Sequence, residues 1–238
     1  MGKLAFVLFV FKYLITHDKD RKAMKAAKEA GDQEKLKKLV AHTYNDVIEN
    51  FCKRFDITID VSGYENVPDC PALYVANHSG MIDAAVLAKM PGGIGIVLKK
   101  EFEKVPFLLK WLSNMNGVFI DRQNPREAVN AINQAAEIIK SGYSMGIFPE
   151  GTRTRDASVG EFKNGAFKIA QKTGCPIVPI AISGSYKLWE DPGKIIPGTI
   201  KAHILEPIYT ENLDRKAIKE LSAVVRQQIV DELESMNK

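Results

Sequence analysis

Short apolar runs alternate with stretches of helical pattern from about residue 56 onward, and this alternation limits the fold more than any other feature of the chain. Strands are expected at 56–62, 72–77, 94–99, 117–121, 144–148, 176–182 and 200–206. Because strands separated by helices connect most readily as parallel neighbours, the pattern predicts an α/β fold. We expect a mixed, mostly parallel sheet that is flanked by helices.

The clearest helix is expected at 125–141, where the sequence marks both ends. Asn124 is a capping residue, Pro125 suits the first helical position, Glu127 completes a capping box and Gly142 ends the helix. Two further helices are expected at 164–173 and 214–236.

Composition indicates a globular protein with a sizeable core. The chain has 238 residues, of which 45% are apolar, and its formal charge is +4. This weak positive charge suits an anionic substrate or an anionic lipid surface. It does not indicate a nucleic-acid partner, because no RNA-binding aromatic motif, zinc finger or basic heptad region accompanies it.

The cysteines are widely spaced and predict neither a redox centre nor a metal site. Cys52, Cys70 and Cys175 form no C-x-x-C pair. Such usage is typical of a reducing compartment. None of the three lies in a recognisable nucleophile motif, so we expect them to be structural residues.

The first 55 residues are expected to form a helical arm that precedes an α/β domain at 56–238. Residues 4–16 are apolar except for Lys12. As a helix they would reach roughly 20 Å, short of the ~30 Å hydrocarbon core, so we expect no membrane span. One interpretation is a helix packed on the domain. The neighbouring basic stretch favours partial insertion into a membrane surface instead.

The rest of the arm, residues 21–55, has the pattern of one or two amphipathic helices. Gly31 and Asp32 interrupt the pattern, and Asp32 offers a helix cap. One face carries apolar residues at steps of three and four, and the other carries lysines and an arginine. Charges of this kind usually form a solvated face, but next to an apolar helix they also suit anionic headgroups. We therefore expect the arm to dock the domain on a membrane.

A histidine and an aspartate follow the run at 72–77 and form the principal candidate for catalysis. His78 lies at the end of that expected strand, and Asp83 lies on the first turn of the following helix. A neutral imidazole can take a proton near pH 7, and a carboxylate behind it can hold the tautomer. A lone histidine is more often a core residue. A metal pair is disfavoured because no third ligand follows at helical spacing.

Three more blocks follow in order, and together with the first they resemble a known family. They are the segments GVFIDR at 117–122, FPEGTR at 148–153 and IVPI at 177–180. The four blocks resemble the glycerolipid acyltransferase family, which makes phosphatidate from lysophosphatidate. The resemblance extends over residues 57–210.

The resemblance implies a reaction, substrates and a location. A fatty acyl group would move from a thioester, on coenzyme A or on acyl carrier protein, to the sn-2 hydroxyl of 1-acylglycerol 3-phosphate. The thioester would be a co-substrate, and no cofactor is expected, since no dinucleotide fingerprint or phosphate-binding loop is present. The protein would lie at the cytoplasmic face of the cell membrane as a monotopic or peripheral protein.

The resemblance also assigns substrate-binding residues. Arg122 and Arg153 are expected to hold the phosphate, with Lys100 as a third candidate. Arg122 could instead pair with Asp121 or Glu127, and Arg153 could be a solvated loop residue. Lys163 is a weaker candidate, because a lysine at the start of a helix is more often a surface residue.

The turn at 150–152 is the second part of the expected binding site. Glu150 would orient an arginine or a substrate hydroxyl. The Gly151 N–H would be a candidate donor to an oxyanion, and Thr152 belongs to the same turn.

The chain departs from the family at Gly80, where the first block commonly has serine. This departure puts a side-chain hydroxyl contact in doubt but leaves His78 and Asp83 unchanged. Rival functions remain: an acyltransferase for another lysolipid, an idle lysophospholipid-binding protein, or a thioesterase that transfers to water. A serine acyl-enzyme is not indicated, since no G-x-S-x-G motif occurs.

Overall fold

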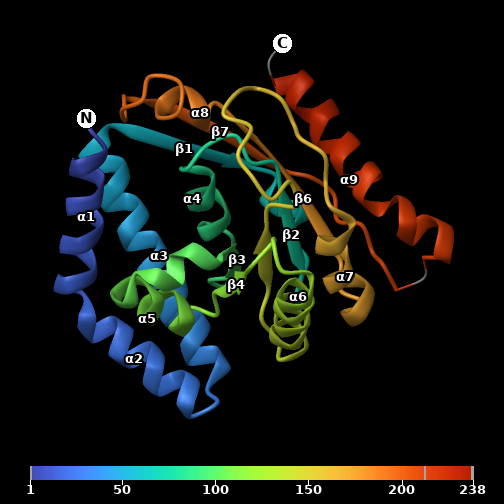
Figure 1. Cartoon of the computed structure of the whole chain (residues 1–238), viewed down its shortest axis with the longest axis horizontal. Helices are drawn as coiled ribbons and strands as arrows, with labels where there is room; N and C mark the ends of the chain where they lie inside the picture. Colours follow the sequence, from blue (N-terminus) through green and yellow to red (C-terminus); the bar gives the residue numbers. More distant parts are fainter. Residues whose placement is uncertain (1, 212, 237–238) are drawn as a thin grey trace.

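A computed structural model describes residues 2–211 and 213–236, and a seven-stranded sheet forms the centre of this part (Figure 1). The strand order is β1-β7-β6-β2-β5-β3-β4. All neighbouring pairs are parallel except β6 and β7. The predicted mixed, mostly parallel sheet is therefore confirmed. The strands are β1 (Ile57–Ser62), β2 (Leu73–Ala76), β3 (Gly95–Lys99), β4 (Val118–Ile120), β5 (Met145–Ile147), β6 (Ile177–Ser183) and β7 (Gly198–Ile204).

Helices cover both faces of the sheet and enclose two hydrophobic cores. The core on one face includes side chains of α2, α3, α4 and α5, and the core on the other face includes those of α6, α7 and α9. The helices are α1 (Lys3–Thr16), α2 (Asp18–Glu29), α3 (Gln33–Phe55), α4 (Asp83–Ala88), α5 (Pro106–Asn114), α6 (Pro125–Lys140), α7 (Asn164–Thr173), α8 (Ser185–Leu188) and α9 (Arg215–Met236). Two short 3-10 helices, η1 (Tyr64–Asn66) and η2 (Lys100–Lys104), lie in connections.

The ends of α6 follow the sequence signals with one exception. The Asn124 side chain accepts hydrogen bonds from the first turn, and Gly142 has a φ of +92° just after the helix. The predicted capping box does not form. The Glu127 carboxylate binds Lys100 instead of the backbone N–H of Asn124, since the lysine offers it a full opposite charge.

The helix α3 is part of the same core as the sheet. Asp32 caps it by accepting from the Lys35 N–H at 3.0 Å. Its apolar face is buried, with Leu36 and Val40 no more than 1% exposed. These side chains pack in one cluster with residues of β1, β2, β6 and β7.

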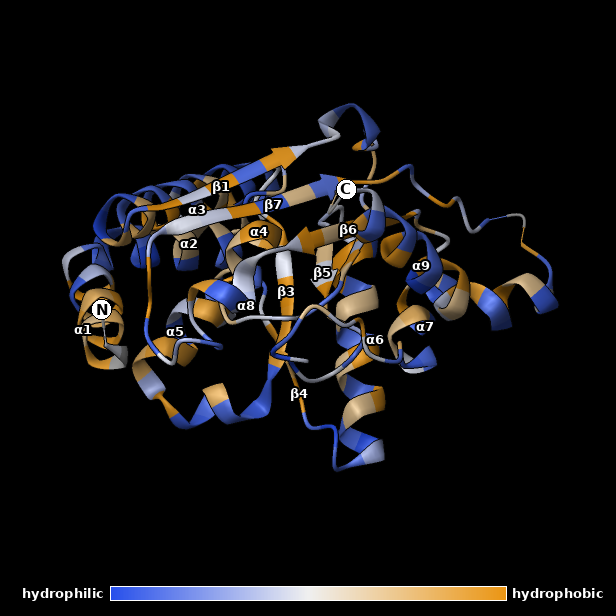
Figure 2. Ribbon diagram, turned by 90° about the horizontal axis from the view of Figure 1, so that it is seen from above, coloured by the Kyte–Doolittle hydropathy of each residue, from blue (hydrophilic) through white to orange (hydrophobic). Residues whose placement is uncertain are grey.

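The helix α1 has one packed side and one exposed apolar side. Phe6 and Phe9 make edge or tilted contacts with Phe51 of α3. The opposite side exposes large apolar residues, namely Leu4, Val7, Leu8, Phe11 and Ile15. Figure 2 shows α1 as a largely hydrophobic ribbon at the edge of the molecule. Across the part of the chain that the structure describes, no helix combines the length and apolarity needed to cross a bilayer.

Candidate active site

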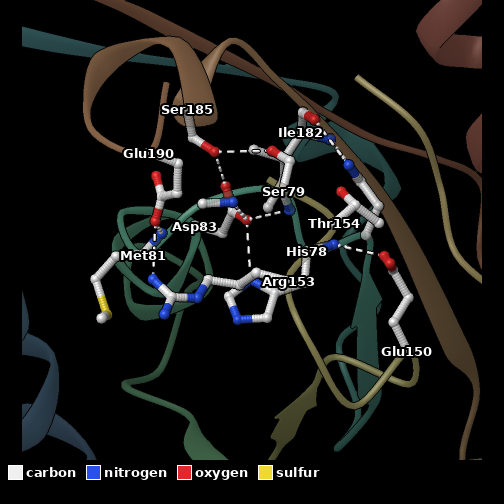
Figure 3. A network of polar contacts seen from close by, with 12 residues as sticks. His78, Ser79, Met81, Asp83, Glu150, Arg153, Thr154, Ile182, Ser185 and Glu190 are labelled. Carbon is white, nitrogen blue, oxygen red and sulfur yellow. Dashed lines mark hydrogen bonds and ion pairs between the residues drawn. The ribbon is translucent and has the colours of Figure 1, made fainter. Parts of the chain in front are cut away.

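His78 and Asp83 meet at the carboxyl end of the central strand β2. The Asn77 side chain first ties the loop to β6, donating to the Ile182 carbonyl at 2.9 Å and accepting from its N–H at 2.8 Å. The His78 Nδ1 then lies 2.9 Å from Asp83 Oδ2 (Figure 3). The structure thus brings together the two side chains that the sequence predicts as a pair.

The surroundings of Asp83 fix the tautomer of His78. Asp83 is fully buried. Its Oδ2 also accepts from the backbone N–H groups of Ser79 and Gly80, each at 2.8 Å, and its Oδ1 accepts from the Ser185 hydroxyl. Because the Asp83 oxygens accept from three other donors, they also present an acceptor to His78, which places the proton of a neutral imidazole on Nδ1. The Nε2 lone pair is left free, and no described residue bonds to it.

An aromatic ring stacks on the imidazole of His78 and fixes its orientation. Phe148 follows β5 and stacks on His78, with ring centroids 4.0 Å apart and planes at 15°. The His78 side chain is 18% exposed. The ring is therefore packed on one face and still reachable by a substrate.

Glu150 organises the backbone around His78. Its Oε1 accepts from the His78 N–H at 2.7 Å, and its Oε2 accepts from the Gly160 N–H at 3.0 Å. Burial raises the pKa of Glu150, while these two hydrogen bonds act in the opposite direction. Both oxygens bind backbone groups, so among the described residues Glu150 orients no arginine.

The turn after Glu150 differs from the expectation in one respect. The Gly151 N–H, expected to be free for an oxyanion, donates to the Phe148 carbonyl at 3.2 Å. Gly151 has a φ of +78°, a conformation that favours glycine. Thr152 is exposed. The turn thus shapes the site mainly through its backbone.

Two of the predicted cations are already paired with carboxylates. Arg153 Nη1 lies 2.8 Å from Glu190 Oε1, and Glu190 also accepts from the Met81 N–H at 2.7 Å. Lys100 binds Glu127 and lies 3.7 Å from Asp121 Oδ2. These pairs reduce the charge that either cation can offer to a phosphate.

Of Lys100, Arg122 and Arg153, Arg122 is the one that forms no ion pair with a described residue. It follows β4, and the alternative interpretation, an ion pair with Asp121 or Glu127, is not found. No described residue makes a hydrogen bond or ion pair with its guanidinium. Burial lowers the pKa of Arg122, and the charge of Glu101 opposes that shift. Arg122 is therefore a partly desolvated cation that is free to bind an anion.

Two neighbouring cavities share Arg122 and Gly151. One of about 400 Å³ lies between α6 and α7 and is also lined by Phe148 and Lys163. The other, of about 520 Å³, includes Lys100 and residues of η2. Volumes of this size suit small-molecule substrates. Phe148 both lines the first cavity and stacks on the imidazole of His78.

Ser185 and Glu190 were not predicted from the sequence. The glycine at position 80 is the one sequence feature that relates to them, because both side chains lie close to it. A Cβ at position 80 would lie 2.6 Å from Ser185 Oγ and 2.9 Å from Glu190 Oε2. The loop approaches α8 too closely for a side chain. The departure from the family pattern at Gly80 therefore has a structural cause, since the Ser185 hydroxyl fills the space beside Asp83.

Replacing Gly80 with alanine is expected to lower the free energy of unfolding by about 1–3 kcal/mol, because the added methyl overpacks a buried site. It should also lower activity by moving Ser185 away from Asp83. Gly165→Ala is the matched control. Nothing lies within 4 Å of a Cβ there, so the helix should gain about 0.5–1 kcal/mol. Denaturant unfolding checks both variants, and equal stability for Gly80→Ala and the native chain would contradict the packing argument.

Comparison with known proteins identifies the fold and the family. A profile of the Acyltransferase family matches residues 58–183. The structure superposes on the crystal structure of the 1-acyl-sn-glycerophosphate (LPA) acyltransferase PlsC from Thermotoga maritima with a TM-score of 0.75 and 26% identity. That match covers 100% of this chain and 98% of the other. It independently supports the mixed sheet flanked by helices.

Relatives at the sequence level come from bacteria, yeast and plants. The chain is 32% identical to the 1-acyl-sn-glycerol-3-phosphate acyltransferase of Pseudomonas aeruginosa over 75% of its own length and 73% of the relative. It is 36% identical to the yeast (Saccharomyces cerevisiae) and Brassica napus chloroplast enzymes of the same name. Those alignments cover 76% and 65% of this chain but only 61% and 46% of the relatives. On the combined evidence of sequence and structure, the chain belongs to the acyltransferase family.

Proposed function

We propose that this protein transfers a fatty acyl group from a thioester to the sn-2 hydroxyl of 1-acylglycerol 3-phosphate and so forms phosphatidate. The observation that carries the proposal is the His78–Asp83 pair, whose Nε2 is free, together with Phe148, which stacks on His78 and lines the cavity that holds Arg122. The relatives named 1-acyl-sn-glycerol-3-phosphate acyltransferase support the same reaction.

The geometry suits general base catalysis without an acyl-enzyme. His78 Nε2 takes the proton of the acceptor hydroxyl as its oxygen attacks the thioester carbonyl. Asp83 stabilises the imidazolium that forms. The tetrahedral intermediate then breaks its C–S bond, and the leaving thiolate takes the proton back from His78. The proton and the acyl group balance, and no external oxidant or reductant is needed.

Arg122 is the phosphate ligand that the geometry supports best, because no described carboxylate forms an ion pair with it. A guanidinium offers paired donors that match two phosphate oxygens. Arg153 adds its remaining N–H groups at the rim, since Glu190 already binds one of its nitrogens. Lys100, Glu150, Gly151 and Thr152 complete the proposed binding site, of which Glu150 acts through the backbone of His78.

The donor is proposed to be an acyl thioester of coenzyme A or of acyl carrier protein, with no resident cofactor. The test is thiol release by the purified protein with each donor, with and without a lysolipid. Release that requires 1-acylglycerol 3-phosphate and yields phosphatidate supports the proposal. Release without an acceptor indicates a thioesterase. Preference for a lysolipid without a phosphate monoester rejects the proposed substrate.

We infer that α1 inserts its exposed face into the membrane surface, on the cytoplasmic side, as a monotopic or peripheral contact. Leu4 and Ile15 are 70% and 63% exposed, and the exposed apolar residues of α1 lie one to three turns apart on one side. Insertion of the apolar side chains of such a face into the headgroup boundary lowers the free energy of the membrane-bound state. This placement would bring the lipid acceptor to the catalytic domain.

Replacing Leu8 and Ile15 together with glutamate is expected to lower binding to anionic phospholipid vesicles by at least about tenfold. Two apolar side chains that would enter the membrane are lost, and two carboxylates meet a negative surface. The matched control is Val224→Glu on α9, where an apolar residue is also exposed. Co-sedimentation with vesicles measures the effect. Equal loss in both variants, or in neither, would argue against docking through α1.

A further inference from the structure

A second cation lies beside Arg122 at the wall of the same cavity. A Cβ built on Gly151 would lie 3.2 Å from Lys163 Nζ and 3.3 Å from Arg122 Nε. The two cationic groups therefore converge on the surface of one glycine. Lys163 directly precedes α7, and its backbone N–H donates to the Pro149 carbonyl at 3.1 Å, which anchors it to the turn at 150–152.

The pair carries two positive charges, and the nearby carboxylate of Glu101 acts on Arg122 only through its charge, without an ion pair. Neither Lys163 nor Arg122 has a side-chain hydrogen bond or ion pair with any residue that the structure describes. Lys100 and Arg153, by contrast, both contact carboxylates. Like charges placed close together repel, and an anion between them removes that cost.

We propose that Lys163 and Arg122 together bind the phosphate of the acceptor, with Gly151 as the floor of the site. This inference rests on the proposed function. It adds Lys163, which lies outside the four sequence blocks, to the residues that bind the phosphate of the acceptor. Glycine is needed at position 151, because a side chain there would enter the space between the two cations.

The charge and the surroundings of the pair favour a phosphate monoester attached to an apolar molecule. A phosphate monoester carries a charge of about −1.5 to −2 at neutral pH, which matches two cations. The cavity beyond the pair is lined mostly by apolar residues, among them Val97, Ile132 and Ile147. Phe148 lines that cavity and touches the His78 ring. A lysolipid bound there would have its phosphate at the pair and its glycerol toward the base.

Replacing Lys163 with methionine tests the inference, with Lys219→Met as the matched control. Both lysines are exposed, but Lys219 lies on α9 and lines neither cavity, whereas Lys163 reaches Gly151. Loss of a charge-assisted contact should raise the KM for 1-acylglycerol 3-phosphate about 10- to 100-fold. The KM for the thioester donor should stay unchanged, and Lys163→Arg should restore most of the affinity. Lys219→Met should behave as the native chain.

Two outcomes would overturn the assignment. A raised KM for the donor alone would place the donor's phosphate, rather than the acceptor's, at the pair. Equal effects of Lys163→Met and Lys219→Met would show that only the general positive charge of the surface matters, and not a site at this pair.

Calorimetric titration with glycerol 3-phosphate separates this inference from the proposed function, because it needs no turnover. Binding that Lys163→Met weakens supports the phosphate site even if no acyl transfer is found. Acyl transfer by the native chain with no effect of Lys163→Met on acceptor KM rejects the site and leaves the function standing. Failure of the native chain to bind the probe would also reject it.

Discussion

Replacing His78 with alanine is expected to lower kcat by roughly 10²- to 10⁴-fold, because Nε2 is the group that takes the proton from the acceptor hydroxyl. The KM for both substrates should change little, since the base contributes mainly in the transition state. Steady-state thiol release with 1-acylglycerol 3-phosphate measures the loss.

The control for this variant is His42→Ala, which removes an exposed imidazole on α3. The control should keep native activity. Denaturant unfolding of His78→Ala should show a cooperative transition, because the ring lies at the rim of the core rather than within it. A kcat within a few-fold of native for folded His78→Ala would exclude this residue as the base.

Asp83→Asn is expected to lower kcat by roughly 10²- to 10⁴-fold, as much as the removal of the base His78 does. An amide in place of Oδ2 would stop accepting from Nδ1–H, and the imidazole would then lose the tautomer that leaves Nε2 free. The amide N–H₂ would also face the N–H groups of Ser79 and Gly80. We therefore expect a lower free energy of unfolding as well, by about 1–3 kcal/mol.

The variant Ser185→Ala separates the loss of catalytic rate in Asp83→Asn from the loss of stability. It removes one donor to Asp83 but leaves the contact between Asp83 and His78 in place. Its kcat should fall far less than that of Asp83→Asn at a similar loss of stability. If the two variants lost activity in proportion to their stability alone, Asp83 would have no role beyond holding the loop.

Much of the fold could be predicted because local patterns and tertiary packing agree. Each expected strand is present within three residues at either end, and Asn124 and Gly142 mark the ends of α6 as predicted. The short helix α8 could not be predicted. It has four residues, too few for a periodic pattern, and it is held by contacts with the loop at Gly80.

The catalytic pair could be predicted because both of its members lie in one short motif. The sequence could not predict which of the candidate cations are free to bind a phosphate, because this depends on which carboxylates lie near them in space. Lys100 follows a strand as expected, yet Glu127 is 27 positions away in the sequence and pairs with it. Lys163 resembles an ordinary surface lysine, and only the fold of the turn at 150–152 brings it to Arg122.

The most direct test of the proposed acyl transfer is a count of products made by the native chain from an acyl thioester and 1-acylglycerol 3-phosphate. We expect one phosphatidate for each thiol released, and no release when the lysolipid is left out. Thiol release that continues without the lysolipid, or that exceeds phosphatidate formation, would show transfer to water and contradict the assignment as an acyltransferase for this acceptor.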